Sequence, residues 1–293
     1  MKRFPIFMAV VILLMLFAGC TTQTEGPHIA ATTLPVFEFT SQLCEGTGLT
    51  VTRLVTEEVS CLHDYSLNVR QVRSAESADL IVISGAGLEE FMHDILENKA
   101  VIDSSSGISL IACSDEHDHD HDHSHHHHDV DNHIWLSPEN AAIMAENICN
   151  GLINQYPEYQ SVFANNLDAL LSDIEAVQIY GTTQLSDLSC RELITFHDGF
   201  AYLAQAFDLS VLKAVEEESG SEASASELKE LILLVQDHEI PSIFTEVNGS
   251  SSAASVISRE TGVPAFSLDM AMGGSSWFDA MYHNIDTLKE ALE

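Results

Sequence analysis

Short apolar runs typical of β-strands alternate along this 293-residue chain with segments whose apolar residues recur every three or four positions. An uninterrupted apolar run at residues 80–83 fits a strand that is covered on both faces of a sheet. Strands that alternate with helices favour parallel pairing. The alternation therefore predicts an α/β fold built on parallel sheets.

The alternation occurs before residue 113 and again after residue 192. Further strands are expected at residues 28–34, 49–55, 108–112, 193–196, 211–215, 242–245 and 265–268. Helices are expected from Pro35 to Cys44, over 88–96, from Pro138 after the N-cap candidate Ser137, over 199–207, after the capping-box pair Ser224 and Glu227, and over 277–292.

A single long helix separates the two halves. Residues 158–180 carry apolar side chains at steps of three and four, and a helix of this length spans roughly 34 Å. We therefore predict an N-terminal α/β lobe at residues 28–157, a linking helix at 158–184 and a C-terminal α/β lobe at 185–293.

The first residues have the features of an export signal. Lys2 and Arg3 precede an apolar stretch, and small residues lead to Cys20, so residues 1–19 are predicted to be a signal peptide. The Ala-Gly-Cys ending resembles a bacterial lipobox, in which the cysteine is acylated. Residues 20–27 would then be a tether that holds the protein on the outer face of the membrane.

Charge and cysteine content narrow the possible partners. The chain carries a net charge of −34, which repels nucleic acid and attracts cations. Export permits disulfides, and the odd number of cysteines after Cys20 means that at least one does not pair within the chain. The sequence leaves the pairing open, with Cys61 and Cys113 as one possible bridge among Cys44, Cys61, Cys113, Cys149 and Cys190.

Residues 115–131 read DEHDHDHDHSHHHHDVD, a tract with eight histidines and seven carboxylates. Imidazole at this density indicates zinc, copper or nickel before magnesium or calcium. We interpret the tract as an accessory set of weak metal sites formed by His117, His119, His121, His123, His125, His126, His127 and His128.

Three other histidines share a placement in loops next to expected strands or capped helices: His63, His133 and His197. Loops at the carboxyl ends of parallel strands are where α/β sheets bind ligands. Three neutral imidazoles can hold Zn²⁺ and leave a fourth position for a carboxylate or water. Asp269, which follows the strand expected at 265–268, is the best candidate for that carboxylate.

The motifs around these residues resemble those of the ZnuA/TroA-like metal-binding proteins of cluster A-1 ABC importers. They are Leu62-His63-Asp64-Tyr65, the segment DNHIWLSP at 131–138 and Phe196-His197-Asp198-Gly199-Phe200. The segments IFTE at 243–246 and ETG at 260–262 also resemble the family. Leu62 and Asn132 depart from it, since the family has proline at both positions.

The resemblance implies two α/β lobes joined by a rigid helix, with the metal between them. It implies that His63 and His133 bind from the first lobe and His197 and Asp269 from the second. Manganese members often have Glu where this chain has His197, and a third nitrogen ligand favours zinc. A histidine-rich loop before the second ligand is likewise typical of zinc members.

We therefore expect a non-enzymatic, monomeric receptor that captures extracytoplasmic Zn²⁺ and delivers it to the permease and ATPase subunits of an ABC importer. Three alternatives remain open: a manganese or iron receptor of the same fold, a zinc hydrolase of the cell surface, and a metal-buffering or adhesive surface protein. The hydrolase would need an open zinc position and a general base, yet the chain has no HExxH motif.

Overall fold

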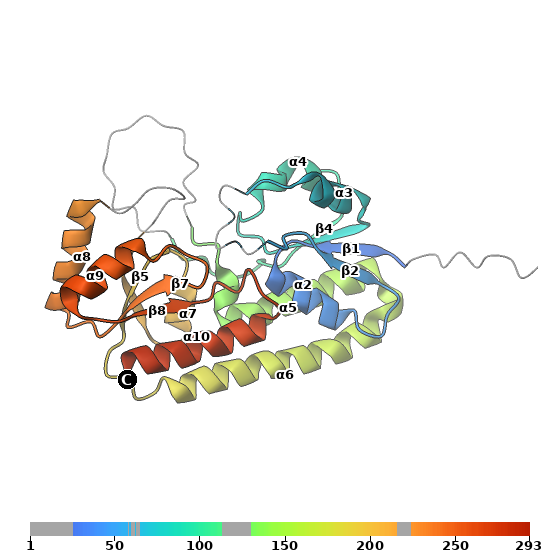
Figure 1. Ribbon diagram of the computed structural model, residues 1–293. Helices are drawn as coiled ribbons and strands as arrows, with labels where there is room; N and C mark the ends of the chain where they lie inside the picture. The colour runs from blue at the N-terminus through green and yellow to red at the C-terminus, as the bar shows by residue number, and fades with distance from the viewer. Residues whose placement is uncertain (1–25, 58, 60–61, 63–64, 113–129, 216–223) are drawn as a thin grey trace, which may run out of the picture.

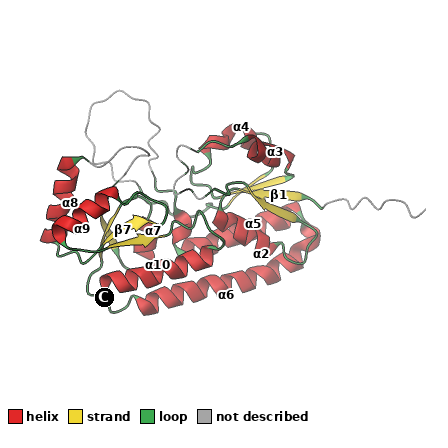
Figure 2. Ribbon diagram, viewed as in Figure 1, coloured by secondary structure: helices red, strands yellow, loops and turns green. Residues whose placement is uncertain are grey.

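The computed structural model describes residues 26–57, 59, 62, 65–112, 130–215 and 224–293. These residues form two lobes, each built on a four-stranded sheet in which every pair is parallel. Figure 1 shows the two lobes side by side above a long helix, and Figure 2 shows each sheet between helices. The predicted fold is confirmed.

The sheet of the N-terminal lobe has the order β2-β1-β3-β4. Its strands are β1 (His28–Ala31), β2 (Thr50–Arg53), β3 (Leu80–Ile83) and β4 (Val101–Asp103). Alternate residues of the central strands enter two different cores: Leu80 and Val82 pack on one face, and Ile81 packs on the other. This double burial explains why β3 is an uninterrupted apolar run.

Helices cover both faces of this sheet (Figure 1). On one face lie α2 (Leu34–Leu43) and α5 (Pro138–Gln155), whereas α3 (Val69–Ser77), the short 3₁₀ turn η1 (Glu90–Met92) and α4 (His93–Leu96) lie on the other. A second 3₁₀ turn, η2 (Ile134–Leu136), leads into α5. Ser137 accepts a hydrogen bond from the backbone of Asn140, as expected for the N-cap of α5.

The sheet of the C-terminal lobe has the order β6-β5-β7-β8. Its strands are β5 (Glu192–Thr195), β6 (Ser210–Ala214), β7 (Ile243–Glu246) and β8 (Ala265–Leu268). Its helices are α7 (Ala201–Ala206), α8 (Ala225–Asp237), α9 (Ser252–Thr261) and α10 (Trp277–Leu292). The predicted capping box of α8 is present, with Ser224 and Glu227 each accepting from the other's backbone N–H.

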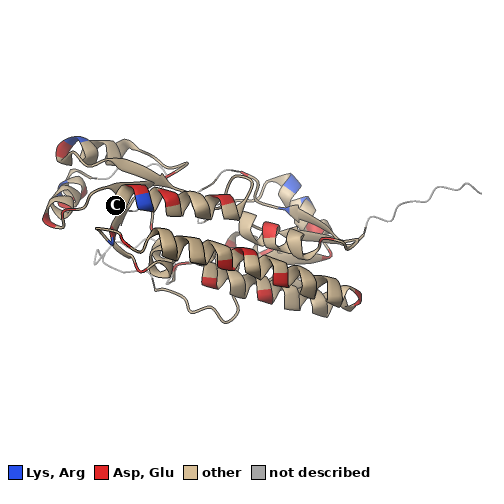
Figure 3. Cartoon of the chain, turned by 90° about the horizontal axis from the view of Figure 1, so that it is seen from below, with Lys and Arg blue, Asp and Glu red and all other residues tan. Residues whose placement is uncertain are grey.

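The linking helix α6 (Gln160–Gln184) follows a 3₁₀ turn, η3 (Pro157–Tyr159). With 25 residues it is about 37 Å long, enough to run beneath both lobes (Figure 1). It packs against α5 of the first lobe and α10 of the second. Figure 3, which views the molecule from below, marks more acidic than basic positions along its helices.

In the N-terminal lobe, two predicted elements differ from the structure and two other elements were not predicted. Residues 108–112 do not form a strand; Ala112 makes only an isolated antiparallel bridge with Val130, after a turn at Gly107 with φ of 83°. The strand before the histidine tract is instead β4, a three-residue segment too short to stand out in the sequence. Helix α3 was not predicted, because only two of its side chains are buried. The helix predicted at 88–96 is divided into η1 and α4.

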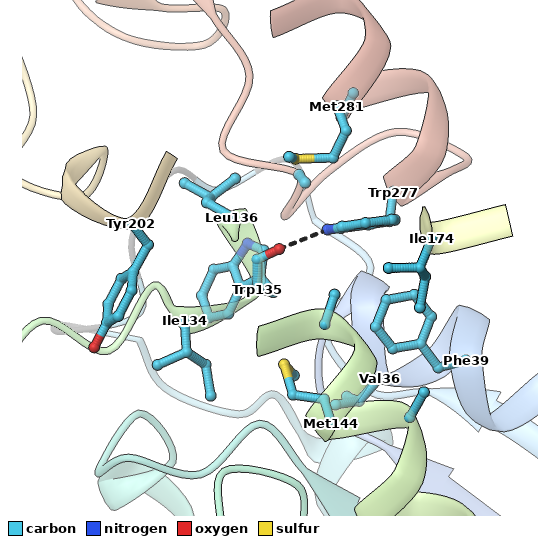
Figure 4. Close-up of a cluster of buried hydrophobic side chains, with 14 of the residues drawn as sticks. Val36, Phe39, Ile134, Trp135, Leu136, Met144, Ile174, Tyr202, Trp277 and Met281 are labelled. Carbon is cyan, nitrogen blue, oxygen red and sulfur yellow. Dashed lines mark hydrogen bonds between the residues drawn. The ribbon is translucent and has the colours of Figure 1, made fainter. Parts of the chain in front are cut away.

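One hydrophobic core runs through both lobes at the level of η2. The indole of Trp135 donates to the carbonyl of Met270 at 2.8 Å, and the indole of Trp277 donates to the carbonyl of Trp135 at 2.9 Å. Figure 4 shows these two rings among Phe39, Met144 and other buried side chains. Both indoles are fully buried, so these hydrogen bonds fix the base of the second lobe against the first.

Several expectations fall outside the described residues: the signal peptide 1–19, most of the tether 20–27 with Cys20, and the histidine tract. Within the described chain, no helix has the length and apolar character needed to span a membrane. Cys44, Cys149 and Cys190 are free thiols, while Cys61 and Cys113 are not described. Burial raises the pKa of the Cys44 thiol to about 12, which keeps it protonated and unreactive.

A buried carboxylate ties together the carboxyl ends of β1 and β3. Glu89 accepts hydrogen bonds from the Thr32 hydroxyl at 2.6 Å and from the backbone N–H groups of Ser84 and Gly85 at 2.8 and 3.0 Å. Desolvation nevertheless raises the pKa of Glu89 to about 7. The native state therefore holds a proton here that the unfolded chain releases at lower pH.

This proton predicts a pH-dependent contribution to stability. The pKa of Glu89 is higher in the native state than in the unfolded chain, so its bound proton stabilises the native state. This stabilisation is complete below about pH 4.5 and is lost as the pH rises through about 7. Chemical unfolding of the metal-free protein should show the free-energy difference between wild type and Glu89→Gln shrinking by about 3 kcal/mol between pH 4.5 and 8. The surface variant Glu45→Gln is the control, and parallel pH profiles for Glu89→Gln and wild type would contradict this expectation.

The inter-lobe hydrogen bond of Trp277 gives a second prediction. Trp277→Phe removes the indole donor and leaves the buried Trp135 carbonyl without it, which should lower the free energy of unfolding by about 1–3 kcal/mol. Leu233→Ala, at a side chain that is 48% exposed, should change it by less than about 0.5 kcal/mol. Urea midpoints measure both, and equal midpoints would show that the indole bond contributes nothing.

Candidate metal site

The carboxyl ends of the two sheets meet between the lobes, and three of the four predicted ligands lie there. His133 immediately precedes η2, His197 lies two residues after β5, and Asp269 directly follows β8. His63 is outside the described residues, as is the whole set of tract histidines at 117–128. The geometry of the site is therefore built from His133, His197 and Asp269.

His133 is held by a buried aspartate two residues before it. Asp131 Oδ1 accepts from the His133 backbone N–H at 2.9 Å and lies 2.8 Å from the ring Nδ1. The two side chains are 3% and 4% exposed. With Nδ1–H donated to the carboxylate, the other ring nitrogen, Nε2, carries the lone pair that a metal needs.

His197 has an equivalent partner in the second lobe. Its Nδ1 lies 3.0 Å from Oε1 of Glu246, the last residue of β7, whose side chain is 6% exposed. The Thr195 hydroxyl donates to the His197 carbonyl at 2.9 Å and fixes the backbone after β5. A carboxylate therefore orients each of the two imidazoles.

The two Nε2 atoms face each other across the cleft at 3.5 Å. Two nitrogens that each lie about 2.0–2.1 Å from a tetrahedral Zn²⁺ are about 3.3–3.4 Å apart. The observed separation is thus close to that of two ligands of one zinc ion. The planes of the two rings are nearly perpendicular, at 85°, and the ring centroids are 5.2 Å apart.

Gly199 lies against both imidazoles. A Cβ at this position would approach His133 Nδ1 to 2.9 Å, His197 Cδ2 to 2.8 Å and Met270 Cε to 2.7 Å. These separations are shorter than van der Waals contact, so a side chain would displace the rings. The glycine in the segment FHDGF is therefore required by the packing of the site.

Asp269 is fixed in the loop between β8 and α10. Its backbone N–H donates to Asn284 Oδ1 at 2.7 Å, and its own Oδ1 accepts from the Ala271 N–H at 2.8 Å. A small cleft is lined by Asp269 and Glu246 from the second lobe and by Val59 from the first. In the described parts of the chain, no group of three or more His, Cys, Asp or Glu side chains is close enough to hold a metal ion. The structure therefore brings together His133 and His197 but not Asp269 with them.

The orienting carboxylates were not predicted. Asp131 is the last residue of the histidine tract, where it is one acidic residue among seven. Glu246 lies in the segment IFTE, which carried no assigned role. A carboxylate two residues before a ligand histidine could have indicated Asp131, whereas only the fold brings Glu246 to His197.

Four further histidines, outside both the tract and the candidate site, have other partners. His28 contacts the Thr52 hydroxyl, His93 contacts Glu97, His238 contacts Glu192, and His283 contacts the carbonyl of Ser267. Each contact is local to one lobe and lies away from the facing imidazoles.

The match to a family model covers residues 29–291 of the 293 residues, and its description is "Zinc-uptake complex component A periplasmic". The chain therefore belongs to the ZnuA family of solute-binding proteins. Figure 1 shows the two-lobe arrangement of this class, with α6 connecting the lobes.

Individual relatives agree with this assignment. The chain is 29% identical over 311 residues to the zinc-binding lipoprotein AdcA of Streptococcus pneumoniae serotype 4, covering 100% of this chain but 62% of that protein. It is 28% identical to the high-affinity zinc uptake system protein ZnuA of Bacillus subtilis strain 168, covering 95% and 94%. The chain thus spans less than two thirds of the streptococcal relative.

Solved structures show the same fold. A crystal structure of ZnuA superimposes with a TM-score of 0.77 at 25% identity, covering 91% of this chain and 99% of that one. Zn(II)-bound AdcA from Streptococcus pneumoniae superimposes with a TM-score of 0.76 at 25% identity, covering 91% and 57%.

The Asp131–His133 pair predicts a loss of metal affinity on substitution. Asp131→Asn should weaken zinc binding about 10–100-fold, because a neutral amide replaces the charged carboxylate that accepts the hydrogen bond from Nδ1–H of His133. Glu192→Gln is a matched control, since Glu192 pairs with His238 at 2.9 Å away from the cleft. Competition with a chromophoric chelator measures the zinc affinity of both variants. Equal zinc affinities of Asp131→Asn and wild type would show that Asp131 does not support metal binding.

Proposed function

We propose that this protein is an extracytoplasmic receptor that binds Zn²⁺ between its lobes and delivers it to the permease of an ABC importer. Membership of the ZnuA family supports a role in metal uptake, and the AdcA and ZnuA relatives named above are described as zinc-binding and zinc-uptake proteins. The proposed ligands are His63, His133, His197 and Asp269, and the permease and its ATPase are the proposed partners.

The facing imidazoles of His133 and His197 carry this proposal. Their 3.5 Å separation suits two nitrogen ligands of one tetrahedral ion, and each ring is polarised by a carboxylate. His63 would complete a set of three nitrogens, to which Asp269 adds an oxygen. Nitrogen-rich, four-coordinate sites favour zinc over manganese, which prefers more oxygen ligands and six-coordination.

Capture and release would depend on the protonation of the imidazoles. Binding needs neutral rings, and Asp131 and Glu246 each accept the Nδ1–H, so that Nε2 faces the ion. Four protein ligands would also leave no position for an activated water, which argues against a zinc hydrolase.

Two further parts of the proposed receptor, the lipid anchor and the histidine tract, lie outside the cleft. Acylation at Cys20 would anchor the receptor beside its permease, with residues 20–27 as the tether. The tract at 115–131 immediately precedes Asn132 and His133, so ions held weakly there would be concentrated next to the tight site. We expect the receptor to act as a monomer.

The ligand assignment predicts the effect of three substitutions. His63→Ala, His133→Ala and His197→Ala should each weaken tight zinc binding at least about 100-fold, since each removes one of four ligands. His238→Ala is the control and should bind like wild type. Competition titration with zinc measures the effect, and undiminished tight binding in all three ligand variants would rule out the site.

The tract is tested by deletion. Removal of residues 115–129 should abolish weak additional zinc equivalents and retain one tight equivalent, because the proposed ligands lie outside it. Equilibrium dialysis across a range of zinc concentrations counts both classes. Loss of the tight equivalent would mean that the tract is part of the principal site.

A further inference from the structure

A second concave site lies on the N-terminal lobe, between the end of β2 and the start of α3. Its cavity of about 610 Å³ is lined by the guanidinium-bearing residues Arg53 and Arg70 together with Thr56, Glu57, Asn68, Gln71 and neighbouring residues. Val69, at its rim, is 67% exposed. The metal site uses none of these side chains.

The positive charge of this pocket contrasts with the rest of the chain. The sequence has 45 acidic and 11 basic residues, yet three arginines (53, 70 and 73) fall within 21 positions. In the described chain, the arginines that form ion pairs with carboxylates are Arg191 and Arg259, not those of the pocket. Glu57, the one acidic residue of the lining, already accepts from Tyr65, Gln71 and Asn68.

Arg53 connects the pocket to the second lobe. Its guanidinium donates to the Gly274 carbonyl at 3.2 Å and to the Thr56 carbonyl at 3.4 Å, both long hydrogen bonds. Partial burial lowers the pKa of Arg53, because burial disfavours its charged form. A carboxylate from outside would stabilise this cation better than two carbonyl oxygens do.

The pocket contacts the segments that carry two proposed metal ligands. Gly274 lies in the same loop as Asp269, between β8 and α10. On the other side, Glu57 accepts from the hydroxyl of Tyr65 at 2.7 Å, and Tyr65 is two residues from His63 in the sequence. A group that binds Arg53 would therefore compete with one of the hydrogen bonds that join the Asp269 loop to the first lobe.

The position of the pocket suits a partner that receives the metal. The continuous core around Trp135, α5, α6 and α10 closes one side of the molecule, so metal leaves on the opposite side. Helix α3 lies on that opposite side (Figure 1). In a chain with 45 acidic and 11 basic residues, the two arginines of this pocket offer an approaching acidic group a local positive charge.

We propose that the β2–α3 pocket receives an acidic side chain from the extracytoplasmic surface of the permease, which pairs with Arg53 and Arg70. This pairing draws Arg53 away from Gly274 and removes one of the contacts that hold the Asp269 loop against the first lobe, so that docking promotes zinc release. The inference rests on the proposed function, because it requires a permease that accepts zinc from this protein.

Zinc uptake into proteoliposomes that contain the cognate permease and ATPase tests the pocket. Arg70→Gln should raise the receptor concentration for half-maximal uptake about ten-fold and leave zinc affinity unchanged. Arg53→Gln should raise it to a similar extent and also speed zinc dissociation from the free receptor. Arg73→Gln, on the same helix with the same charge change but outside the pocket lining, should match wild type.

Salt dependence separates a charge pair from a structural role. Raising ionic strength should weaken docking of wild type and Arg73→Gln more than docking of Arg70→Gln, which lacks the charge to be screened. If Arg53→Gln and Arg70→Gln transport like Arg73→Gln, the pocket is not the docking site. If wild type itself supports no uptake, the proposed function fails first, and the docking proposal fails with it.

A small anion is the competing occupant. Titration calorimetry with inorganic phosphate should give no saturable heat with wild type, because the proposed occupant is a protein carboxylate. Saturable phosphate binding that disappears in Arg70→Gln would overturn the proposal and assign the pocket to a free anion.

Discussion

The reciprocal indole hydrogen bonds between Trp135, Trp277 and the backbone are the constraint on which the two-lobe arrangement depends. Each bond joins a residue of η2 to the loop or helix that follows β8, so the two sheets cannot move apart at their base. Glu38 of α2 adds to this junction by accepting from Ser276 and Trp277 at the start of α10. The carboxyl ends of β5 and β8 are consequently held opposite His133.

On this base the site consists of two nearly matching halves. Each lobe contributes an imidazole whose Nδ1 is bound by a buried carboxylate, Asp131 for His133 and Glu246 for His197. The pairs fix both tautomers, so the two Nε2 atoms meet at 3.5 Å with lone pairs available. Arg53 of the arginine pocket donates a hydrogen bond to Gly274 in the loop that carries Asp269, which would let a docking event act on the site.

Much of the fold was predictable because burial imposes a regular spacing of apolar residues on many of its helices and strands. The double-faced strand β3, the capping box at Ser224, the final helix α10 and the long helix α6 all leave local signals of apolar spacing or capping. Elements without such signals were missed. Helix α3 is mostly exposed, β4 has three residues, and the apolar segment at 108–112 buries Ile108 without pairing in a sheet.

The sequence by itself determined the class of fold, the family and the candidate histidines of the site, since these depend on local spacing and on motifs that survive in the linear chain. Tertiary structure decided which nitrogen of each ring faces the cleft, that Glu246 orients His197, and that Gly199 must lack a side chain. It also decided that Arg53 contacts Gly274, 221 residues away. These relations join segments from different strands and lobes, and only the packing of the sheets fixes the distances between them.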